Sequence, residues 1–188
     1  MDHIRQLIAR SQKNDPAAFE KLIEVYQGRV FTLCRQLTNN PTDAQDLAQE
    51  VFIRAWSGLG GFRQEADFGT WLHRIAVNQW LNAKRRLNRL EIVSLDAPLT
   101  VGESQLTREA PSEDPGPAER FEQEEARLQL QQALQRLSPE HRAVLVLREL
   151  QDLNYEEIAA VLDCSLGTVK SRLNRARQAL REELSSKS

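Results

Sequence analysis

Apolar residues recur at intervals of three and four along most of the chain, and this spacing constrains the fold more than any other feature. The spacing places apolar side chains along one side of an α-helix. The chain has only 8 Gly and few runs of β-branched residues, which argues against β-sheets. We therefore predict an all-α protein.

The helical pattern fails between residues 92 and 118, a stretch that is acidic and rich in proline. Residues 91–125 hold ten acids and two arginines, a net charge of −8, so the rest of a chain with net charge −2 carries about +6. That distribution is compatible with nucleic-acid binding. The composition predicts a linker. We expect helical domains at 1–91 and 121–188, joined by an acidic linker at 92–120.

Other sequence features exclude several classes of protein. The N-terminus is polar, and no apolar run approaches the ~20 residues of a membrane span, so we predict a soluble, cytoplasmic protein. Cys34 and Cys164 lie far apart, and the three histidines are scattered, so the chain lacks the clustered ligands of a zinc site. We expect no metal and no cofactor, and interpret both thiols as small buried side chains.

Capping sequences mark four helix starts. Asp15 and Ser138 each precede a proline, as an N-cap often does. The segment 42–45, TDAQ, is typical of a capping box, and Asn154 stands three residues before Glu157.

The strongest local signal is the segment 154–181, NYEEIAAVLDCSLGTVKSRLNRARQALR. We expect a short helix over about 155–162, a turn at 163–165, and a second helix capped by Ser165. Ala159 is small at the point where two crossing helices must approach closely. This is the layout of a helix-turn-helix.

The second helix of this motif has an apolar side and a cationic side. At ~100° per residue, the side that faces the core carries Val169, Leu173, Ala176 and Leu180. The opposite side carries Ser171, Asn174 and Gln178, flanked by Lys170, Arg175, Arg177 and Arg181. There is no acid from Leu166 to Arg181, whereas a merely solvated helix usually mixes both signs. We predict that this side enters a DNA major groove, where cations meet phosphates and short polar groups reach base edges.

Residues 43–59 predict an amphipathic helix with an unusual outer side. Its apolar half comprises Ala44, Leu47, Ala48, Val51, Phe52, Ala55 and Leu59. Its outer side carries Asp46, Gln49, Glu50 and Ile53, with Trp56 at the border. An acidic side with an exposed Ile and Trp is typical of a protein-docking surface. The alternative is an ordinary amphipathic helix with one stray apolar residue.

A further helix is predicted over residues 70–90. Its buried stripe comprises Leu72, Ala76, Trp80, Ala83, Leu87 and Leu90. The opposite side carries Trp71, Arg74, Asn78, Arg85 and Arg89. Bases stack on aromatic rings and phosphates meet guanidinium groups, so this side favours single-stranded nucleic acid. A solvated face would leave the outward tryptophan unexplained.

The segment 60–69, GGFRQEADFG, is predicted to be a flexible loop long enough to hold an extruded base. Arg63 and the rings of Phe62 and Phe68 are its candidate contacts. Either ring is equally well explained as a core residue, and the sequence leaves that choice open.

Three segments of the chain resemble the extracytoplasmic function (ECF) class of bacterial sigma factors. DAQDLAQEVFIRAW (43–56) resembles the clamp-binding segment of that family. FRQEADFGTWLHRIAVNQWLNAKRR (62–86) resembles its promoter-melting and minus-ten segment. LNYEEIAAVLDCSLGTVKSRLNRARQALR (153–181) resembles its minus-thirty-five helix-turn-helix. Three such segments in this order, with an acidic linker, make the resemblance specific over nearly the whole length.

The resemblance implies a promoter-specificity subunit of RNA polymerase that catalyses nothing itself. The clamp of the polymerase's largest subunit would contact Asp46, Gln49, Glu50, Ile53 and Trp56, and the flap of the second-largest subunit is a further implied partner. Minus-ten DNA would be captured and melted by Phe62, Arg63, Phe68, Trp71, Arg74, Asn78, Arg85 and Arg89. Minus-thirty-five DNA would be bound by Lys170, Ser171, Arg172, Asn174 and Arg175.

The resemblance also implies an anti-sigma factor that clamps both domains, and a linker that runs through the positively charged channel of the polymerase. The alternative function is a freestanding helix-turn-helix regulator, which would need an apolar ligand pocket or a dimer seam. A nucleic-acid enzyme is less favoured, because the acids cluster away from the basic faces.

Overall fold

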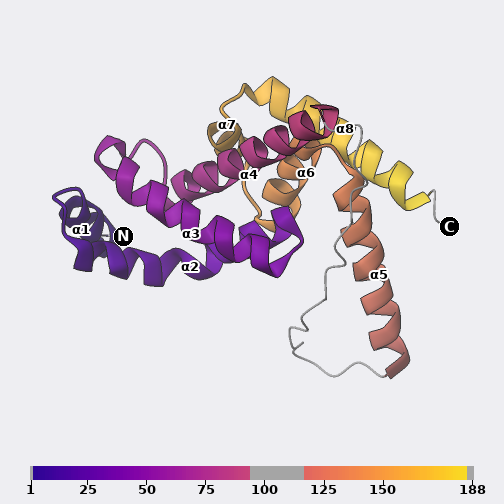
Figure 1. The fold of residues 1–188 in the computed structure, drawn as a ribbon, viewed down its shortest axis with the longest axis horizontal. Helices are drawn as coiled ribbons and strands as arrows, with labels where there is room; N and C mark the ends of the chain where they lie inside the picture. The colour runs from indigo at the N-terminus through magenta and orange to yellow at the C-terminus, as the bar shows by residue number, and fades with distance from the viewer. Residues whose placement is uncertain (1, 94–116, 186–188) are drawn as a thin grey trace.

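The computed structural model describes residues 2–93 and 117–185, and every regular element in these ranges is helical (Figure 1). The all-α prediction is therefore confirmed. The N-terminal half contains α1 (Asp2–Ser11), α2 (Pro16–Thr38), α3 (Pro41–Gly58), the short turn η1 (Leu59–Gly61) and α4 (Phe68–Val93). The C-terminal half contains α5 (Pro117–Arg136), α6 (Pro139–Leu145), the π-helical turn η2 (Val146–Leu150), α7 (Tyr155–Leu162) and α8 (Leu166–Ser185).

Three of the four predicted helix starts are confirmed by their caps. The side chains of Asp15 and Ser138 each accept a hydrogen bond from the backbone N–H three residues on, at 3.1 and 3.3 Å. Asn154 and Glu157 form a reciprocal capping box with distances of 2.9 and 2.8 Å. These bonds satisfy N–H groups that the first turn of a helix leaves without a partner.

The fourth predicted cap is wrong in position. Asn40 caps α3, because its Oδ1 accepts hydrogen bonds from the backbone N–H groups of Thr42 and Asp43 at 2.9 and 3.3 Å. Pro41 therefore occupies the first helical turn, where its missing N–H costs nothing. The capping box predicted at 42–45 does not form, since the helix has already begun there.

The predicted apolar side of α3 faces the core of the N-terminal half. Ala44, Ala48, Val51 and Ala55 are buried, and so is Leu59 in η1. Leu47 and Phe52 flank this stripe and are half-buried. Small alanines at successive turns let α3 pack closely on α2 and α4.

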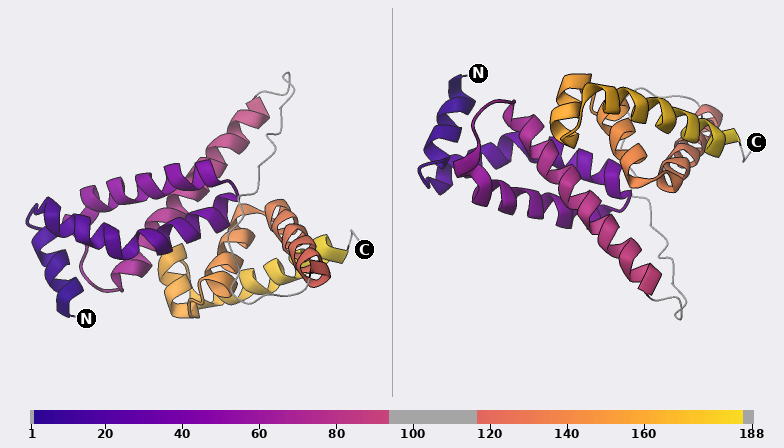
Figure 2. Two further views of the ribbon diagram at one scale, coloured as in Figure 1. Left: turned by 90° about the horizontal axis from the view of Figure 1, so that it is seen from below. Right: turned by 90° about the horizontal axis from the view of Figure 1, so that it is seen from above.

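The predicted buried stripe of α4 is correct only in its first half. Leu72, Ala76 and Trp80 are buried, but Ala83 and Leu87 are exposed, with 52% of Leu87 accessible. The reason is that α4 extends beyond the ends of α2 and α3, as the projecting end of the helix shows in Figure 2. The side chain of Leu90 lies outside the described residues.

The C-terminal half is built around α8, which packs against α5, α6 and α7. Its helix-turn-helix comprises α7 and α8, with the turn at 163–165 as predicted. Asp163 ends α7 in the left-handed conformation, with φ of 50°. A single residue there reverses the chain direction before α8 begins.

The two halves lie side by side in all views and are in contact (Figures 1 and 2). α4 packs against α6 and α7, and the end of α2 meets η2. The linker was predicted at 92–120, but α4 continues to Val93 and α5 begins at Pro117. The rest of the predicted linker lies outside the described residues.

Candidate nucleic-acid interface

The outer side of α8 is available to a ligand. Ser165 caps the helix by accepting a hydrogen bond from the N–H of Thr168 at 3.1 Å. Val169, Leu173 and Ala176 are buried as predicted, whereas Leu180 is only half-buried. The predicted DNA-contacting side chains Lys170, Ser171, Asn174 and Arg175 are exposed, and Arg172 is half-buried. The arrangement matches a recognition helix, with its apolar side on the core and its cations outward.

One predicted cation of α8 is engaged within the protein. Arg177 donates from Nε and Nη2 to Oε1 of Glu149, at 3.0 and 2.6 Å. The hydrogen bond that it donates to Glu149 raises the pKa of the guanidinium further above its ordinary value. The sequence predicts Arg177 beside the DNA-facing side of the helix, but this pair instead ties α8 to η2.

The predicted outer side of α4 is partly open to solvent and partly in contact with the C-terminal half. Asn78 and Arg89 are exposed, and Trp71 is half-buried. Arg74 and Arg85 are about half exposed, and each meets an acid of the C-terminal half: Asp163 at 3.6 Å and Glu140 at 3.7 Å. The side predicted to bind nucleic acid is thus partly turned toward the other half of the same chain.

An aromatic cluster underlies the start of α4. The ring centroid of Phe62 lies 4.9 Å from that of Trp71 and 5.4 Å from that of Phe68. Phe68 also meets the edge of Tyr26 at 5.2 Å. Phe62 and Phe68 are 7% and 3% exposed. They are core residues in this structure, which is the alternative that the sequence left open, and of the three rings only Trp71 reaches the surface.

The loop before α4 ends in a hydrogen-bonded cap. Asp67 caps the helix, because its Oδ2 accepts from the N–H of Gly69 at 2.8 Å. A Cβ at Gly69 would lie 2.9 Å from that carboxylate and 3.3 Å from the ring of Tyr26, so a larger residue there would force the capping side chain to shift. Arg63 is exposed in the same loop. The cap thus fixes the start of α4, two residues before Trp71.

The predicted docking face of α3 is solvent-accessible along its length. It comprises Asp46, Gln49, Glu50, Ile53 and Trp56. Ile53 is 61% exposed and Trp56 36% exposed, although the Trp56 ring rests on Phe19 with centroids 5.0 Å apart. Glu50 pairs with Arg54 of the same helix at 2.6 Å. Exposed apolar residues among acids are what a protein-binding surface presents before it is covered.

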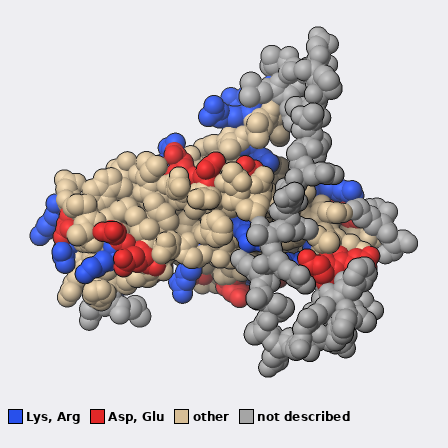
Figure 3. Space-filling view, turned by 60° about the horizontal axis from the view of Figure 1, so that its bottom comes forward, with Lys and Arg blue, Asp and Glu red and all other residues tan. Residues whose placement is uncertain are grey.

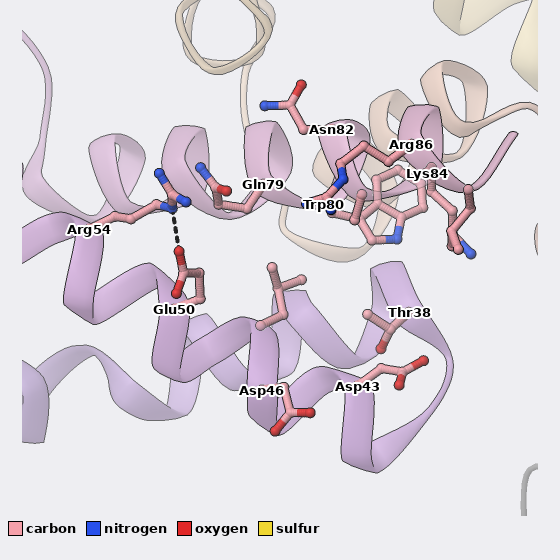
Figure 4. Close-up of a pocket in the computed structure, with 13 residues that line it drawn as sticks. Thr38, Asp43, Asp46, Glu50, Arg54, Gln79, Trp80, Asn82, Lys84 and Arg86 are labelled. Carbon is pink, nitrogen blue, oxygen red and sulfur yellow. Dashed lines mark ion pairs between the residues drawn. The ribbon is translucent and has the colours of Figure 1, made fainter. Parts of the chain in front are cut away.

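A cavity of 480 Å³ lies beside the docking face, between α3 and α4. One wall carries the acids Asp43, Asp46 and Glu50, and the other carries Lys84 and Arg86 (Figure 4). Its apolar lining includes Leu47, Trp80, Ala83 and Leu87. Figure 3 shows acidic side chains of the N-terminal half gathered beside the basic end of α4. We call this cavity the groove.

The described residues contain no cluster of three or more His, Cys, Asp or Glu that could hold a metal ion. No helix in the described ranges is long and apolar enough to cross a membrane. Cys34 is fully buried, and burial raises the pKa of its thiol to about 12. Cys164 is half-buried, so the interpretation of both cysteines as buried thiols is only partly correct.

Two protein-family models match the segments of the chain that carry these surfaces. The family model for sigma-70 region 2 matches residues 22–90, which include the docking face and most of α4. The model for sigma-70 region 4 matches residues 127–180, which include the helix-turn-helix. RNA polymerase sigma-H factor of Pseudomonas aeruginosa is 36% identical over 96% of this chain and 93% of its own. The ECF RNA polymerase sigma-E factor of Escherichia coli is 38% identical over 93% of this chain and 90% of its own.

The chain belongs to the ECF family of sigma factors.

Solved structures agree with this family. CnrH in complex with the cytosolic domain of CnrY is 27% identical, with a TM-score of 0.66 over 99% of both chains. The sigma factor RpoE of Bartonella quintana, solved with the anti-sigma factor NepR, has a TM-score of 0.68 at 24% identity and supports the fold. It covers 89% of this chain and 96% of its own. The protein is therefore a transcription initiation factor of two helical regions with a DNA-binding helix-turn-helix.

Sequence reasoning missed two buried polar residues of this sigma factor, Arg142 and His73. Arg142 is 5% exposed, and its Nη2 donates to the backbone carbonyl of Gln36 at 3.0 Å. His73 of α4 is also buried. The sequence offers one signal for Arg142, which is its position directly before the apolar run AVLVL (143–147). An arginine is rarely buried unless a partner holds its charge, so a cation next to such a run is unusual.

Proposed function

We propose that this sigma factor binds core RNA polymerase through the docking face of α3 and directs it to promoters with two DNA-reading helices. The observation that carries the proposal is the separation of three exposed surfaces on rigid helices: acidic and apolar on α3, aromatic and cationic on α4, and acid-free on the outer side of α8 up to Arg181. A freestanding regulator would have no use for the first two surfaces.

The upstream promoter element is assigned to α8. Lys170 and Arg175 would meet phosphates on either side of a major groove, while Ser171 and Asn174 would reach base edges. All four side chains are exposed and lie opposite the buried stripe of Val169 and its neighbours.

The minus-ten element is assigned to the start of α4 and its loop. Because Phe62 and Phe68 are core residues, they hold the site together, and the surface left for an unstacked base consists of Trp71, Asn78 and Arg63. Stacking on an aromatic side chain returns about 1–3 kcal/mol per base, comparable to the cost of extruding it. Capture of one or two bases therefore suffices to start melting without ATP.

Core polymerase is assigned to the docking face. The acids of α3 would suit a basic partner surface, which we assign to the clamp of the largest subunit, and Ile53 and Trp56 supply the apolar centre that a stable interface needs. The flap of the second-largest subunit is the assigned partner of the C-terminal half. An anti-sigma factor is also proposed as a partner, because the related CnrH forms a complex with the cytosolic domain of CnrY.

Charge reversal on α3 tests this function. Asp46→Arg combined with Glu50→Arg is expected to abolish co-purification with core polymerase, because cations replace the acids on the surface that meets the clamp. The matched control is Glu20→Arg with Glu24→Arg, which changes the charge equally at exposed positions of α2.

Circular dichroism checks that both double variants remain folded, since Glu50→Arg also removes the pair with Arg54. Retention of core binding by the α3 variant, or equal loss in the α2 control, would contradict the assignment of the docking face.

A further inference from the structure

A side chain from the N-terminal end of the chain reaches the loop that leads into α4. Gln12 stands in the turn between α1 and α2, and its Nε2 donates hydrogen bonds to two backbone carbonyls, that of Leu59 at 3.1 Å and that of Phe62 at 2.9 Å. In both views of Figure 2, α1 lies beside this loop. Gln12 precedes residue 22, where the match to sigma-70 region 2 begins, so that match does not include it.

The two bonds connect the ends of a single turn. A side-chain amide has two N–H donors, which is enough for both carbonyls. The Leu59 carbonyl also accepts a hydrogen bond from the N–H of Phe62 at 3.1 Å, which closes the turn η1. Gln12 therefore bridges the first and the last carbonyl of this turn. It is half-buried, and a carbonyl left without a partner there would cost more than one in open solvent.

Gln12 is itself anchored to the core of the N-terminal half. Leu7 and Ile8 of α1 are buried in that core. The backbone N–H of Gln12 donates to the carbonyl of Ile8 at 2.9 Å. The turn that follows is closed by an ion pair of Arg10 with Asp15 at 2.7 Å. The amide is thus fixed by α1 and α2 rather than by the loop that it contacts.

The bond to Phe62 sets the direction in which the chain enters the exposed part of the loop. The carbonyl of Phe62 and the N–H of Arg63 belong to one planar peptide group and point in opposite directions. Because Gln12 holds the carbonyl on the side of α1, the N–H of Arg63 faces away from α1, and it makes no hydrogen bond among the described residues. This peptide group therefore presents a donor beside the Arg63 cation, at the point where the loop becomes exposed.

The other end of the exposed stretch is fixed independently. Asp67 caps α4 by accepting a hydrogen bond from the N–H of Gly69 at 2.8 Å. Residues 63–66 between the two anchors are exposed, and Gln64 among them has a left-handed φ of 58°. A short segment fixed at both ends has fewer conformations than one fixed at a single end. Loss of the Gln12 bonds would therefore add conformations to the exposed part of the loop.

We propose that Gln12 is a positioning residue of the minus-ten site: it holds the carbonyls of Leu59 and Phe62, so that the exposed loop begins from one fixed peptide group beside Trp71. The proposal rests on the proposed function, in which this loop and Trp71 capture an unstacked base. Gln12 acts through the loop and needs no contact with DNA. A loop that is already ordered loses less entropy on binding, so more of the stacking free energy remains as affinity.

Two substitutions separate the hydrogen bonds from the packing of the side chain. Gln12→Met keeps a similar length and volume but has no donor. Gln12→Glu keeps the shape, while its carboxylate faces two carbonyl oxygens, so we expect the larger effect from this substitution. The control Gln27→Met makes the same exchange as Gln12→Met at an exposed position of α2.

Hydrogen exchange of the free chain measures the loop directly. Peptides that cover residues 59–67 should exchange about tenfold faster in Gln12→Met than in the parent chain, and faster still in Gln12→Glu, because the turn loses two hydrogen bonds. Peptides from α8 should exchange at the parent rate in both variants, and Gln27→Met should match the parent chain throughout. Unchanged exchange of the loop in Gln12→Met would overturn the proposal.

Binding of single-stranded oligonucleotides to the holoenzyme measures base capture. The oligonucleotides carry the minus-ten element read from transcript starts, either intact or with one base at a time replaced by an abasic site. We expect the parent holoenzyme to lose about tenfold in affinity when the captured base is removed, and the Gln12→Met holoenzyme to lose about threefold or less. A partly unfolded variant would bind both oligonucleotides more weakly in the same proportion, so this ratio reports the position of the loop and not stability.

The two measurements separate this proposal from the proposed function. A ratio in Gln12→Met equal to that of the parent holoenzyme would overturn the positioning role. If removal of no base weakens binding by the parent holoenzyme, base capture itself is overturned, and the exchange of residues 59–67 still decides whether Gln12 positions the loop.

Discussion

Arg175 and Arg177 lie two residues apart on α8, yet their side chains have different interactions. Arg175 is exposed and makes no ion pair among the described residues, so its charge is available to a ligand. Arg177 is held by two hydrogen bonds to Glu149. The sequence predicts cations on this helix, but it does not indicate which of them an acid from η2 will bind.

Arg175→Ala should reduce the free energy of binding to the upstream promoter element by about 1–3 kcal/mol, because a phosphate or base contact is lost. Protection of that element in footprints should weaken accordingly. Arg177→Ala should leave that protection nearly unchanged and lower the free energy of unfolding by about 1 kcal/mol or less, as expected for an exposed pair. Footprinting of the two holoenzymes compares them directly. Equal loss of protection would show that both arginines contact DNA.

His73 predicts a pH dependence of stability. Desolvation by burial lowers the pKa of its imidazole, Arg29 lowers it further, and Asp67 and Glu157 act in the opposite direction. The unfolded chain has the ordinary pKa near 6.5 and binds the proton more readily than the folded chain. The contribution of neutral His73 is therefore complete above that pKa and is lost as the pH falls below it.

Between about pH 7.5 and pH 5.5, the melting temperature of the parent chain should fall more than that of His73→Gln. The control is His3→Gln at an exposed position, which should follow the parent chain. Parallel pH curves for the parent chain and His73→Gln would contradict a buried neutral imidazole.

At the scale of elements, the sequence predicts α4 well where the helix is covered and poorly where it is not. Leu72, Ala76 and Trp80 follow the predicted stripe because α2 and α3 lie beneath them. Leu87 continues the same spacing but is exposed, because those neighbours have ended. Periodicity shows which residues share a side of a helix, but not how far the partner helices extend.

The aromatic cluster shows a second limit of the same kind. From the sequence, Phe62 and Phe68 are equally compatible with base stacking and with a place in the core. The structure shows both rings buried, so they are core residues. Their role becomes indirect, since both support Trp71 at ring distances of 4.9 and 5.5 Å.

Trp71→Ala should slow open-complex formation about tenfold, because it removes the ring of the aromatic cluster that reaches the surface at the proposed minus-ten site. Trp71→Phe should restore most of the rate. The control Ile75→Ala truncates another half-buried side chain of α4, one turn further on. Permanganate reactivity of unpaired thymines follows melting, and equal reactivity with the Trp71→Ala and parent holoenzymes would count against base capture at this site.

At the scale of the whole molecule, sequence reasoning predicts the elements and their exposed sides but not how the two halves meet. The acidic side of α3 and the cationic side of α8 are both where periodicity places them. The contact between the two halves was not predicted, because each half satisfies its own helical pattern and contacts over 106 residues of separation, such as Arg142 to Gln36, leave no local signal. Buried polar residues in this structure therefore carry information that the apolar pattern omits.

The most direct measurement is transcription by purified core polymerase on a library of random upstream sequences, with and without this chain, followed by sequencing of the transcript starts. We predict that adding the chain produces new starts that share two upstream elements, one for α4 and one for α8. The Asp46→Arg, Glu50→Arg variant should produce none of them. Start sites that do not change when the chain is added would contradict the account.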